Sequence, residues 1–359
     1  MNILFTTHQG NLAGSTLSLI YLVKGLAHRG HQIHVACKKA VLLEKSLTGY
    51  SNVTVHEIPF ASYFDFRSCI KLKRVILSNK IQIVNAQGGR DRNLTILTKW
   101  IFGLEYKLIF TRRQRPRSEP LIKRWFHTNG TDKIIMISEG LKQIFLEKGY
   151  SEDHLLVIKN GIPSNLSEQV DPCKVEQLKK NLHLLDQPVV GCLSRKKSQE
   201  QVIEAFRFLP DHYIGLFVGI DEEEMGDLSD IKQRLIFTGQ VEHHTALHYL
   251  KLMSVNVLPS YLDGFGLTLV ESMQLGIPVI GSDFGGIPDI IQSGENGFLF
   301  ENGNVNELAQ KIVELIENAD LREKFIAKGK EDSRSLFSIK RVVDEYETFF
   351  KSLVDDFPV

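Results

Sequence analysis

The stretch Pro259-Ser260-Tyr261-Leu262-Asp263-Gly264-Phe265-Gly266-Leu267-Thr268-Leu269-Val270-Glu271 decides the fold class of this chain. The apolar run 255–258 before it predicts a strand, and a helix is predicted from about Leu267. Glycines between a strand and a helix N-terminus let backbone N–H groups approach an anion, and the helix dipole adds positive potential there. A diphosphate fits such a turn. Asp263 and Glu271 add carboxylates, which accept hydrogen bonds from sugar and ribose hydroxyls.

The same stretch resembles the E-x7-E signature of the family 4, group 1 retaining glycosyltransferases, which have the GT-B fold. The family pattern Pro-Ser-x-x-Glu-Gly-Phe-Gly-x-x-x-x-Glu-Ala-Met matches with Asp263 in place of the first Glu and Glu271-Ser272-Met273 at its end. Further family elements follow in order at 276–279, 285–289 and 294–297. The resemblance implies transfer of a hexose-type sugar from a nucleotide diphosphate sugar to an acceptor hydroxyl, with retention of the anomeric configuration.

Short apolar runs alternate with amphipathic ones along the chain, which indicates α/β domains with parallel sheets. Strands are predicted at 2–6, 33–37, 53–58, 81–86, 107–111, 133–137 and 155–158, and in a second series at 189–191, 213–219, 234–238, 255–258, 278–281 and 297–300. Predicted helices include 15–29, 67–79, 92–103, 139–148, 304–318, 320–333 and 338–352.

The 359 residues are long for one core, and the two series predict two Rossmann-like domains. We expect an acceptor-binding domain at 1–165 and a nucleotide-sugar-binding domain at 166–336, with Asn160-Gly161-Ile162-Pro163 and the polar stretch 164–187 that follows as the linker candidate. Ligands of open α/β sheets bind beyond the carboxyl ends of the strands, so the active site is expected in a deep cleft where the sheets face each other. The family resemblance implies that the helix within 337–359 crosses back to the N-terminal domain.

Three cations, Arg195-Lys196-Lys197, follow the first strand of the second domain, where they would neutralise a leaving diphosphate. Lys197 matches a family Lys, but Cys192 occupies the position of a family Arg, so Lys196 is expected to supply the second charge. The alternative is a solvated basic turn. Val241 ends a segment that resembles the family's Phe-x-Gly-x-Val, where backbone atoms commonly face the nucleobase.

The resemblance implies that Asp263 positions the donor sugar and that Glu271 holds the ribose hydroxyls. Lys196, Lys197 and Arg113 complete the predicted catalytic set, with a leaving phosphate oxygen assisting the acceptor hydroxyl. The remaining predicted donor contacts are Gly14, Arg195, Val241, Gly264, Phe265, Gly266, Leu267 and Thr268. GT-B enzymes do not generally need a metal and the chain has no Asp-x-Asp motif, so we expect no metal and no cofactor beside the nucleotide sugar.

Four arginines lie within six residues after the predicted strand 107–111, and such an array favours binding of phosphate or carboxylate. Arg113 stands where the family often has His, so the family's His-based role is not transferred. The predicted contacts to an anionic acceptor are Gly10, Asn11, Arg90, Arg112, Arg115 and Arg117. Gly10, Asn11 and Gly14 belong to the loop His8–Thr16, which occupies the place of the family's Gly-Gly-Ala-Glu loop. The alternatives are a solvated arginine loop and a packing turn without ligand contacts.

The charges are divided unevenly, although 43 basic residues balance 43 acidic ones. Residues 1–166 carry 24 Lys and Arg against 11 Asp and Glu, a net +13, which leaves −13 for 167–359. Two explanations stay open, an anionic acceptor or lipid surface and electrostatic pairing of the two domains. Trp100-Ile101-Phe102 and Trp125-Phe126 lie among basic residues, which is typical either of an interfacial membrane surface or of core packing.

The four cysteines form no C-x-x-C pair, so neither a zinc ribbon nor a disulfide framework is indicated. No leader-like segment and no run of eighteen apolar residues is present. We expect a cytoplasmic protein, peripheral at the inner face of the membrane, without a nucleic-acid partner, in bacterial-type lipopolysaccharide or polysaccharide biosynthesis. Two rival hypotheses are a nucleotide-sugar epimerase or phosphorylase on the same fold, and a nucleotide-binding pseudoenzyme, which Asp263 and Cys192 suggest.

Overall fold

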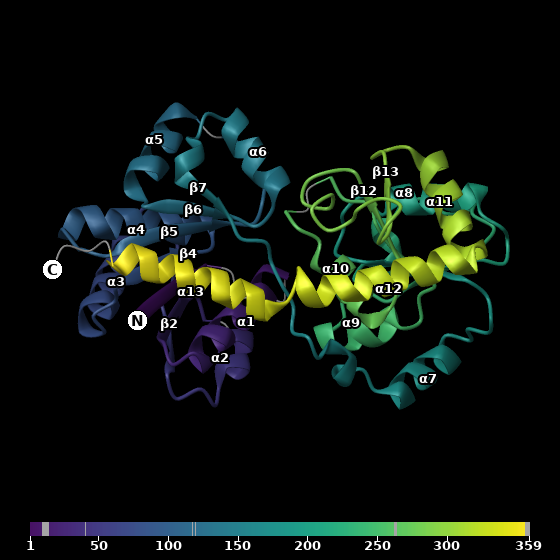
Figure 1. The fold of residues 1–359 in the computed structure, drawn as a ribbon, viewed down its shortest axis with the longest axis horizontal. Helices are drawn as coiled ribbons and strands as arrows, with labels where there is room; N and C mark the ends of the chain where they lie inside the picture. Colours follow the sequence, from purple (N-terminus) through teal and green to yellow (C-terminus); the bar gives the residue numbers. More distant parts are fainter. Residues whose placement is uncertain (9–13, 40, 117, 119, 262–263, 356–359) are drawn as a thin grey trace. The chain divides into compact units, whose positions relative to one another are not determined.

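The computed structural model describes residues 1–8, 14–39, 41–116, 118, 120–261 and 264–355. The chain divides into two compact units, Met1–Asn160 with Ile339–Val359, and Gly161–Ser338. Each unit is a parallel sheet with helices, as predicted (Figure 1).

The first unit has a seven-stranded sheet in the order β3-β2-β1-β4-β5-β6-β7. Its strands are β1 (Asn2–Thr7), β2 (Gln32–Cys37), β3 (Val53–Glu57), β4 (Ile83–Ala86), β5 (Lys107–Arg112), β6 (Lys133–Met136) and β7 (Leu155–Val157). The chain runs outward from β1 to β3 and then returns to β4 on the other side of β1. The topological switch point, where ligands of such sheets bind, therefore lies between β1 and β4.

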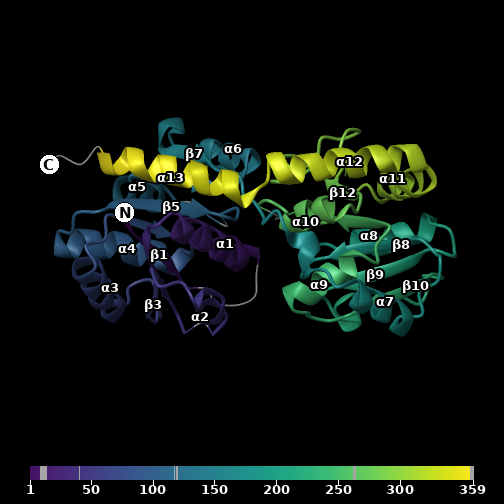
Figure 2. The ribbon, with the colours of Figure 1, turned by 60° about the horizontal axis from the view of Figure 1, so that its bottom comes forward.

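The helices of the first unit include the C-terminal helix of the described chain. They are α1 (Gly14–His28), α2 (Val41–Leu47), α3 (Phe66–Ser78), α4 (Gly89–Phe102), α5 (Leu121–Gly130), α6 (Glu139–Glu147), the 3-10 turn η1 (Glu152–His154) and α13 (Ile339–Asp355). Helices α1 and α13 lie side by side (Figure 2), and a Cβ on Gly25 would come within 2.3 Å of Val343. Phe350 packs in one apolar cluster with Ile3 and Phe5, so the predicted return of the last helix is present.

The second unit has a six-stranded sheet in the order β10-β9-β8-β11-β12-β13. Its strands are β8 (Val189–Leu193), β9 (Ile214–Val218), β10 (Arg234–Phe237), β11 (Val255–Leu258), β12 (Val279–Ser282) and β13 (Phe298–Phe300). The chain moves from β8 to β10 and then returns to β11, so the switch point of this sheet lies between β8 and β11. The loops that follow these two strands carry the predicted cations and the predicted diphosphate turn.

The helices of the second unit are α7 (Pro172–Asn181), α8 (Glu200–Ala205), α9 (His243–Leu250), α10 (Leu267–Leu275), α11 (Val305–Glu317) and α12 (Ala319–Ser335), with the 3-10 turns η2 (Leu166–Gln169), η3 (Phe206–Phe208) and η4 (Glu222–Glu224). The boundary between the two units, at Asn160 and Gly161, lies within the predicted linker 160–187, but the polar part of that stretch is not a linker throughout, because it contains α7, which packs against α9. The polar composition was misleading because α7 buries no residue. In the part of the chain that the structure describes, no helix combines the length and hydrophobicity needed to cross a membrane.

Candidate functional site

The turn between β11 and α10 contains glycines that let other groups approach its backbone closely. Gly266 precedes α10 with φ 100°, a backbone conformation that glycine adopts without steric cost. A Cβ on Gly286 would lie 2.3 Å from the Gly264 carbonyl oxygen, so the paired glycines of 285–286 let a second loop press against the first. The predicted contacts Leu267 and Thr268 begin the first turn of α10. The N–H groups of a first helical turn have no carbonyl acceptor within the helix and can bind a ligand. Asp263 lies outside the described residues.

Phe265 fixes this turn rather than presenting its ring to a ligand. Its side chain is buried and meets Phe337 edge to face, with ring centroids 5.8 Å apart. Only the backbone of Phe265 is therefore suited to the donor contact that the sequence predicted.

Glu271 has a partner that the sequence pattern did not reveal. Its side chain is 3% exposed, and its Oε1 lies 2.7 Å from Nε2 of His243, the first residue of α9. Burial opposes the charged imidazole, but the hydrogen bond and the negative charge of Glu271 outweigh burial and raise the pKa of His243. His243 follows the predicted nucleobase residue Val241 by two positions, which is the only signal of its role in the sequence.

The cationic turn after β8 is shaped by Gln199, which is fully buried. Its side-chain amide donates to the carbonyls of Ser194 and Arg195, and its Oε1 accepts from the N–H of Lys197 at 2.5 Å. Lys197 is half-buried, whereas Arg195 is exposed. The exposed Lys196 donates from Nζ to the Glu224 carbonyl at 2.6 Å.

Cys192 occupies the family's Arg position and contributes no charge there, because its side chain packs in the apolar core of the second unit. A buried amide instead links the elements on both sides of the switch point. Asn256 of β11 accepts from the Leu193 N–H at 3.3 Å and donates to Ser272 Oγ at 2.9 Å. These bonds hold the strand before the cationic turn and the helix of Glu271 in fixed register.

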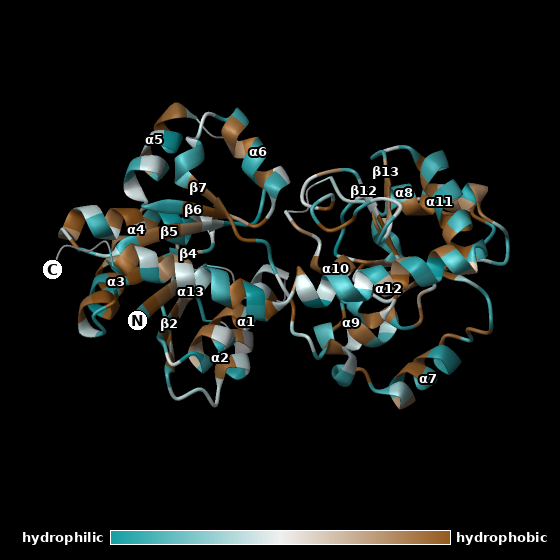
Figure 3. Cartoon of the chain, in the orientation of Figure 1, coloured by the Kyte–Doolittle hydropathy of each residue, from teal (hydrophilic) through white to brown (hydrophobic). Residues whose placement is uncertain are grey.

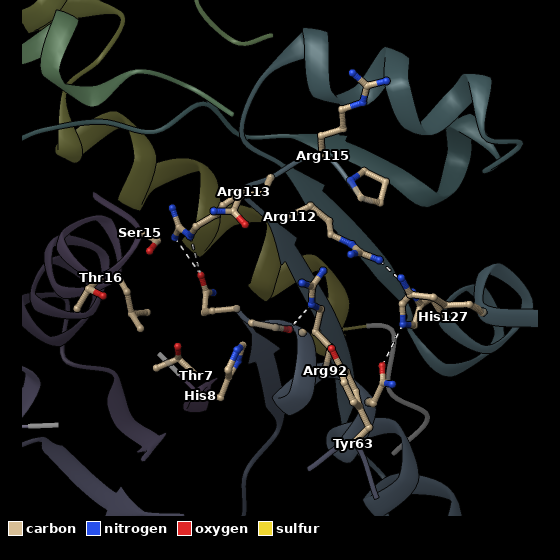
Figure 4. A pocket seen from close by; sticks show the side chains of 18 of the residues that line it. Thr7, His8, Ser15, Thr16, Tyr63, Arg92, Arg112, Arg113, Arg115 and His127 are labelled. Carbon is tan, nitrogen blue, oxygen red and sulfur yellow. Dashed lines mark hydrogen bonds between the residues drawn. The ribbon is translucent and has the colours of Figure 1, made fainter. Parts of the chain in front are cut away.

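The first unit has a cavity of about 550 Å³ at its own switch point, where β1, β4 and β5 end (Figure 4). Of the predicted acceptor residues, Arg112 and Arg115 line this cavity together with the predicted catalytic residue Arg113, whereas Arg90 does not and donates to the Ala61 carbonyl. Gly10, Asn11 and Arg117 lie outside the described residues. Gly14, the remaining predicted donor contact, begins α1 immediately before Ser15 and Thr16, which line the cavity.

Two family models together match nearly all of these elements. The model described as glycosyltransferase family 4 matches residues 13–166, and the one described as glycosyl transferases group 1 matches residues 175–332. The chain belongs to the group 1 glycosyltransferases. The two matches divide the sequence close to the boundary between the two structural units.

Relatives of this glycosyltransferase cover most of its length. N-acetyl-alpha-D-glucosaminyl L-malate synthase of Bacillus anthracis is 24% identical, with 96% of each chain covered. The capsular polysaccharide biosynthesis glycosyltransferase CapM of Staphylococcus aureus is 25% identical, covering 87% of this chain and 88% of CapM. The structure of Anabaena HepE in complex with UDP-glucose superposes with a TM-score of 0.84 at 20% identity, over 98% of this chain and all of HepE, which shows a shared GT-B fold.

The glycosyltransferase's predicted arginine array separates into side chains in different environments. Arg113 is half-buried and donates to Gln87 Oε1 at 2.9 and 3.1 Å and to Asn160 Oδ1 at 3.0 Å. Arg115 is exposed and extends away from the other labelled side chains in Figure 4. Arg113 is thus held by two side chains with its guanidinium at the cavity wall.

Arg112 is 5% exposed and forms a buried chain with two neutral groups. Its Nη2 lies 2.9 Å from Nδ1 of His127, whose Nε2 lies 3.1 Å from Asn93 Oδ1. Burial and the charges of Arg112, Arg92 and Lys123 lower the pKa of His127 to about 2. A neutral His127 accepts from Arg112 and donates to Asn93, so the arginine keeps its charge beside the cavity.

The tryptophans of the glycosyltransferase are solvent-facing, which resolves one alternative left by the sequence. Trp100 is 43% exposed and Trp125 58% exposed, with ring centroids 6.1 Å apart. Leu121 and Ile122, at the start of α5, are 72% and 77% exposed. These four side chains are therefore not packed in the core, and hydrophobic segments of the helices that carry them, α4 and α5, are visible in Figure 3.

Proposed function

We propose that this protein transfers a hexose-type sugar from a nucleotide diphosphate sugar to an acceptor hydroxyl, with retention of the anomeric configuration. The turn before α10 carries the proposal, because it joins a glycine-lined helix N-terminus to the buried carboxylate of Glu271 at a topological switch point. A helix N-terminus suits the diphosphate, and the Glu271 oxygen not engaged by His243 suits a ribose hydroxyl.

The proposed catalysis is electrostatic. Backbone N–H groups of Gly266 to Thr268 and the ammonium of Lys197 stabilise the charge that develops on the leaving diphosphate. One of its oxygens assists the acceptor hydroxyl on the same face of the sugar, and Asp263 positions the donor sugar. No resident metal or cofactor takes part, so transfer is expected to persist in EDTA.

UDP is the first nucleotide to test, since HepE, which shares the fold, was solved with UDP-glucose. Calorimetry with UDP, GDP and ADP comes first, followed by a nucleotide-sugar panel and NMR of the product's anomeric configuration. An inverted product would contradict retention. Conversion of the donor without an acceptor would identify an epimerase, dependence on free phosphate would identify a phosphorylase, and nucleotide binding without turnover would identify a pseudoenzyme.

We propose further that the acceptor is anionic and belongs to a cell-surface glycan or glycolipid. Five cations line the cavity of the first unit, and no acidic side chain is among the described residues that line it. The cations are Arg92, Arg112, Arg113, Arg115 and Lys123. CapM acts in capsular polysaccharide biosynthesis, which supports this class of pathway.

We propose peripheral contact with the cytoplasmic face of the membrane through Trp100, Leu121, Ile122 and Trp125. Exposed aromatic and aliphatic side chains beside lysines and arginines suit an anionic bilayer. Sedimentation with phosphatidylglycerol vesicles should recover the protein, and vesicles of phosphatidylcholine should recover much less. Trp125→Asp should abolish recovery, whereas Phe208→Asp, at an equally exposed position of the second unit, should not. Equal loss in both variants would contradict this surface.

A further inference from the structure

His8 and Asp91 form a pair at the floor of the acceptor cavity that neither the sequence pattern nor the proposed mechanism uses. His8 follows the end of β1 and lines the cavity (Figure 4), while Asp91 lies in the first turn of α4 and is not among the lining residues. The His8 Nδ1 is 2.8 Å from Asp91 Oδ1, and the Asp91 side chain is completely buried.

The Asp91 carboxylate is held from several sides. Its Oδ2 accepts from the N–H groups of Gln87 and Gly88 at 3.1 and 2.9 Å and from Thr6 Oγ at 3.2 Å. Its Oδ1 accepts from the N–H of His8 at 3.3 Å as well as from the ring. Every one of these partners is a donor, so the carboxylate acts only as an acceptor and its orientation is fixed.

This arrangement sets which ring nitrogen of His8 faces the ligand. Because Asp91 accepts from Nδ1, the proton of the neutral imidazole resides on Nδ1 and Nε2 carries the lone pair. Nε2 is the ring nitrogen that Asp91 does not engage, and His8 is one of the residues that line the cavity. An acceptor atom of this kind binds a hydroxyl donor, whereas an anionic group is drawn to the guanidinium groups instead.

Gly88 provides the room that the pair requires. A Cβ at this position would lie 2.2 Å from His8 Nδ1 and 2.3 Å from Asp91 Oδ1, closer than packed atoms approach. The glycine that caps α4 thus leaves room for the imidazole, which a side chain at this position would displace.

The rest of the cavity wall is rich in hydroxyl and amide groups. Among its described residues only Leu19 and Pro116 are aliphatic. The uncharged polar lining residues are Thr7, Ser15, Thr16, Tyr63, Gln87, Asn93, Gln114 and Ser118. Apolar ligand sites have mostly hydrophobic walls, so this composition favours a ligand with many hydroxyl groups.

We propose that the cavity takes a polyhydroxylated anion of the sugar-phosphate class, whose anionic group binds Arg113 and whose hydroxyl group donates to His8 Nε2. This hydroxyl is not the one that receives the sugar, so His8 is a specificity-determining residue and Asp91 positions it. The inference rests on the proposed function for its meaning, because it assigns the chemical class of the acceptor.

The test measures binding of glucose 6-phosphate, with inorganic phosphate as the anion-only probe and UDP as the reporter of the other unit. His8→Ala should weaken glucose 6-phosphate binding about tenfold, the equivalent of one hydrogen bond, and should leave phosphate and UDP binding unchanged. His8→Gln should restore part of the affinity, because its amide oxygen accepts in place of Nε2. Arg113→Lys should weaken both phosphate ligands.

Two further variants separate positioning from folding. Asp91→Asn offers an amide donor to Nδ1, which moves the ring proton to Nε2, and should reproduce the loss caused by His8→Ala. In protein with ¹⁵N-labelled histidine, the His8 Nε2 resonance should shift with glucose 6-phosphate but not with phosphate, and Asp91→Asn should abolish the shift. Gly88→Ala should reduce sugar-phosphate affinity while UDP binding persists.

The proposal is overturned if the wild-type protein fails to bind glucose 6-phosphate, or if His8→Ala weakens phosphate and glucose 6-phosphate equally. Failure of the wild-type protein to bind any of UDP, GDP and ADP would contradict the proposed function instead. The two failures are thus distinguishable, because the probes report on different structural units.

Discussion

A histidine lies at each of the two sites of this glycosyltransferase, buried His127 in the first unit and half-buried His243 in the second, and their pKa values shift in opposite directions. In the first unit, burial and the surrounding arginines lower the pKa of His127 to about 2. In the second unit, Glu271 overcomes burial and raises the pKa of His243. The cavity of the first unit is therefore dominated by the positive charges of its arginines. The site of the second unit contains the buried carboxylate of Glu271 and the backbone N–H groups at the start of α10.

This difference shows how one architecture supports two kinds of recognition. The second unit presents backbone N–H groups and the buried carboxylate of Glu271, which suit a nucleotide diphosphate whatever sugar it carries. The first unit presents side chains, held by networks such as Arg113 with Gln87 and His8 with Asp91. Side chains change by substitution more readily than a backbone turn, so acceptor choice is the property that this fold varies most easily.

The largest expected effect concerns the cations of the second unit. Replacing both Lys196 and Lys197 by Ala should lower turnover by about two to three powers of ten and weaken donor binding much less, because the charge to be stabilised develops during reaction. Lys197→Ala alone should account for most of the loss, since Lys196 donates to the Glu224 carbonyl. Steady-state kinetics check this, with Lys179→Ala as the control. Equal effects on turnover and donor affinity would indicate uniform binding instead.

The next effect concerns the nucleotide itself. Glu271→Ala should weaken binding of the cognate nucleotide by roughly 1–3 kcal/mol, because ribose hydroxyls lose their acceptor. Calorimetry with UDP measures it, and Glu314→Ala on α11 serves as a control carboxylate of the same unit. Unchanged affinity would remove Glu271 from the site and leave its bond with His243 as a structural feature.

The strand–turn–helix around Gly266 could be predicted from sequence because its elements are contiguous and the glycines report a local backbone requirement. The pairs His243 with Glu271 and His8 with Asp91 could not, because 28 and 83 residues separate their members and only the strand order brings them together. Helix α7 was missed for a different reason, since a helix that buries nothing resembles a polar linker in composition.

The arginine array illustrates the limit of charge patterns. Its members look equivalent in sequence, yet Arg112 is buried against His127, Arg113 is half-buried against Gln87, and Arg115 is exposed. Burial depends on the alternation of β5 and on neighbouring elements, which the local pattern does not contain. The charge of the array could be predicted, but the role of each guanidinium could not.

The lowered pKa of His127 predicts how the stability of the first unit responds to acid. His127 remains neutral in the folded state, so below its ordinary pKa of 6.5 the unfolded chain binds a proton that the folded chain does not. Titration of His127 therefore leaves the free energy of unfolding unchanged above pH 6.5. Below that pH the free energy of unfolding falls, by about 2 kcal/mol at about pH 5. Both tryptophans, Trp100 and Trp125, lie in this unit, so urea unfolding followed by fluorescence measures it. His127→Gln should flatten this slope, and an unchanged slope would contradict a neutral His127.

The smallest expected effect is a difference in acceptor KM between variants of exposed Arg115 and of half-buried Arg113. Arg113→Lys should raise the acceptor KM more than Arg115→Lys, because lysine cannot reproduce the planar bonds to Gln87 and Asn160 that aim the guanidinium at the cavity. Increasing salt should weaken the contribution of exposed Arg115 first, since solvent ions screen it more effectively. Acceptor KM measured over a salt series in both variants, with donor KM as the internal control, tests this order. If neither variant nor salt changes the acceptor KM, these arginines do not bind the acceptor, and the alternative explanation of the net +13 of residues 1–166, pairing with the acidic C-terminal half, is favoured.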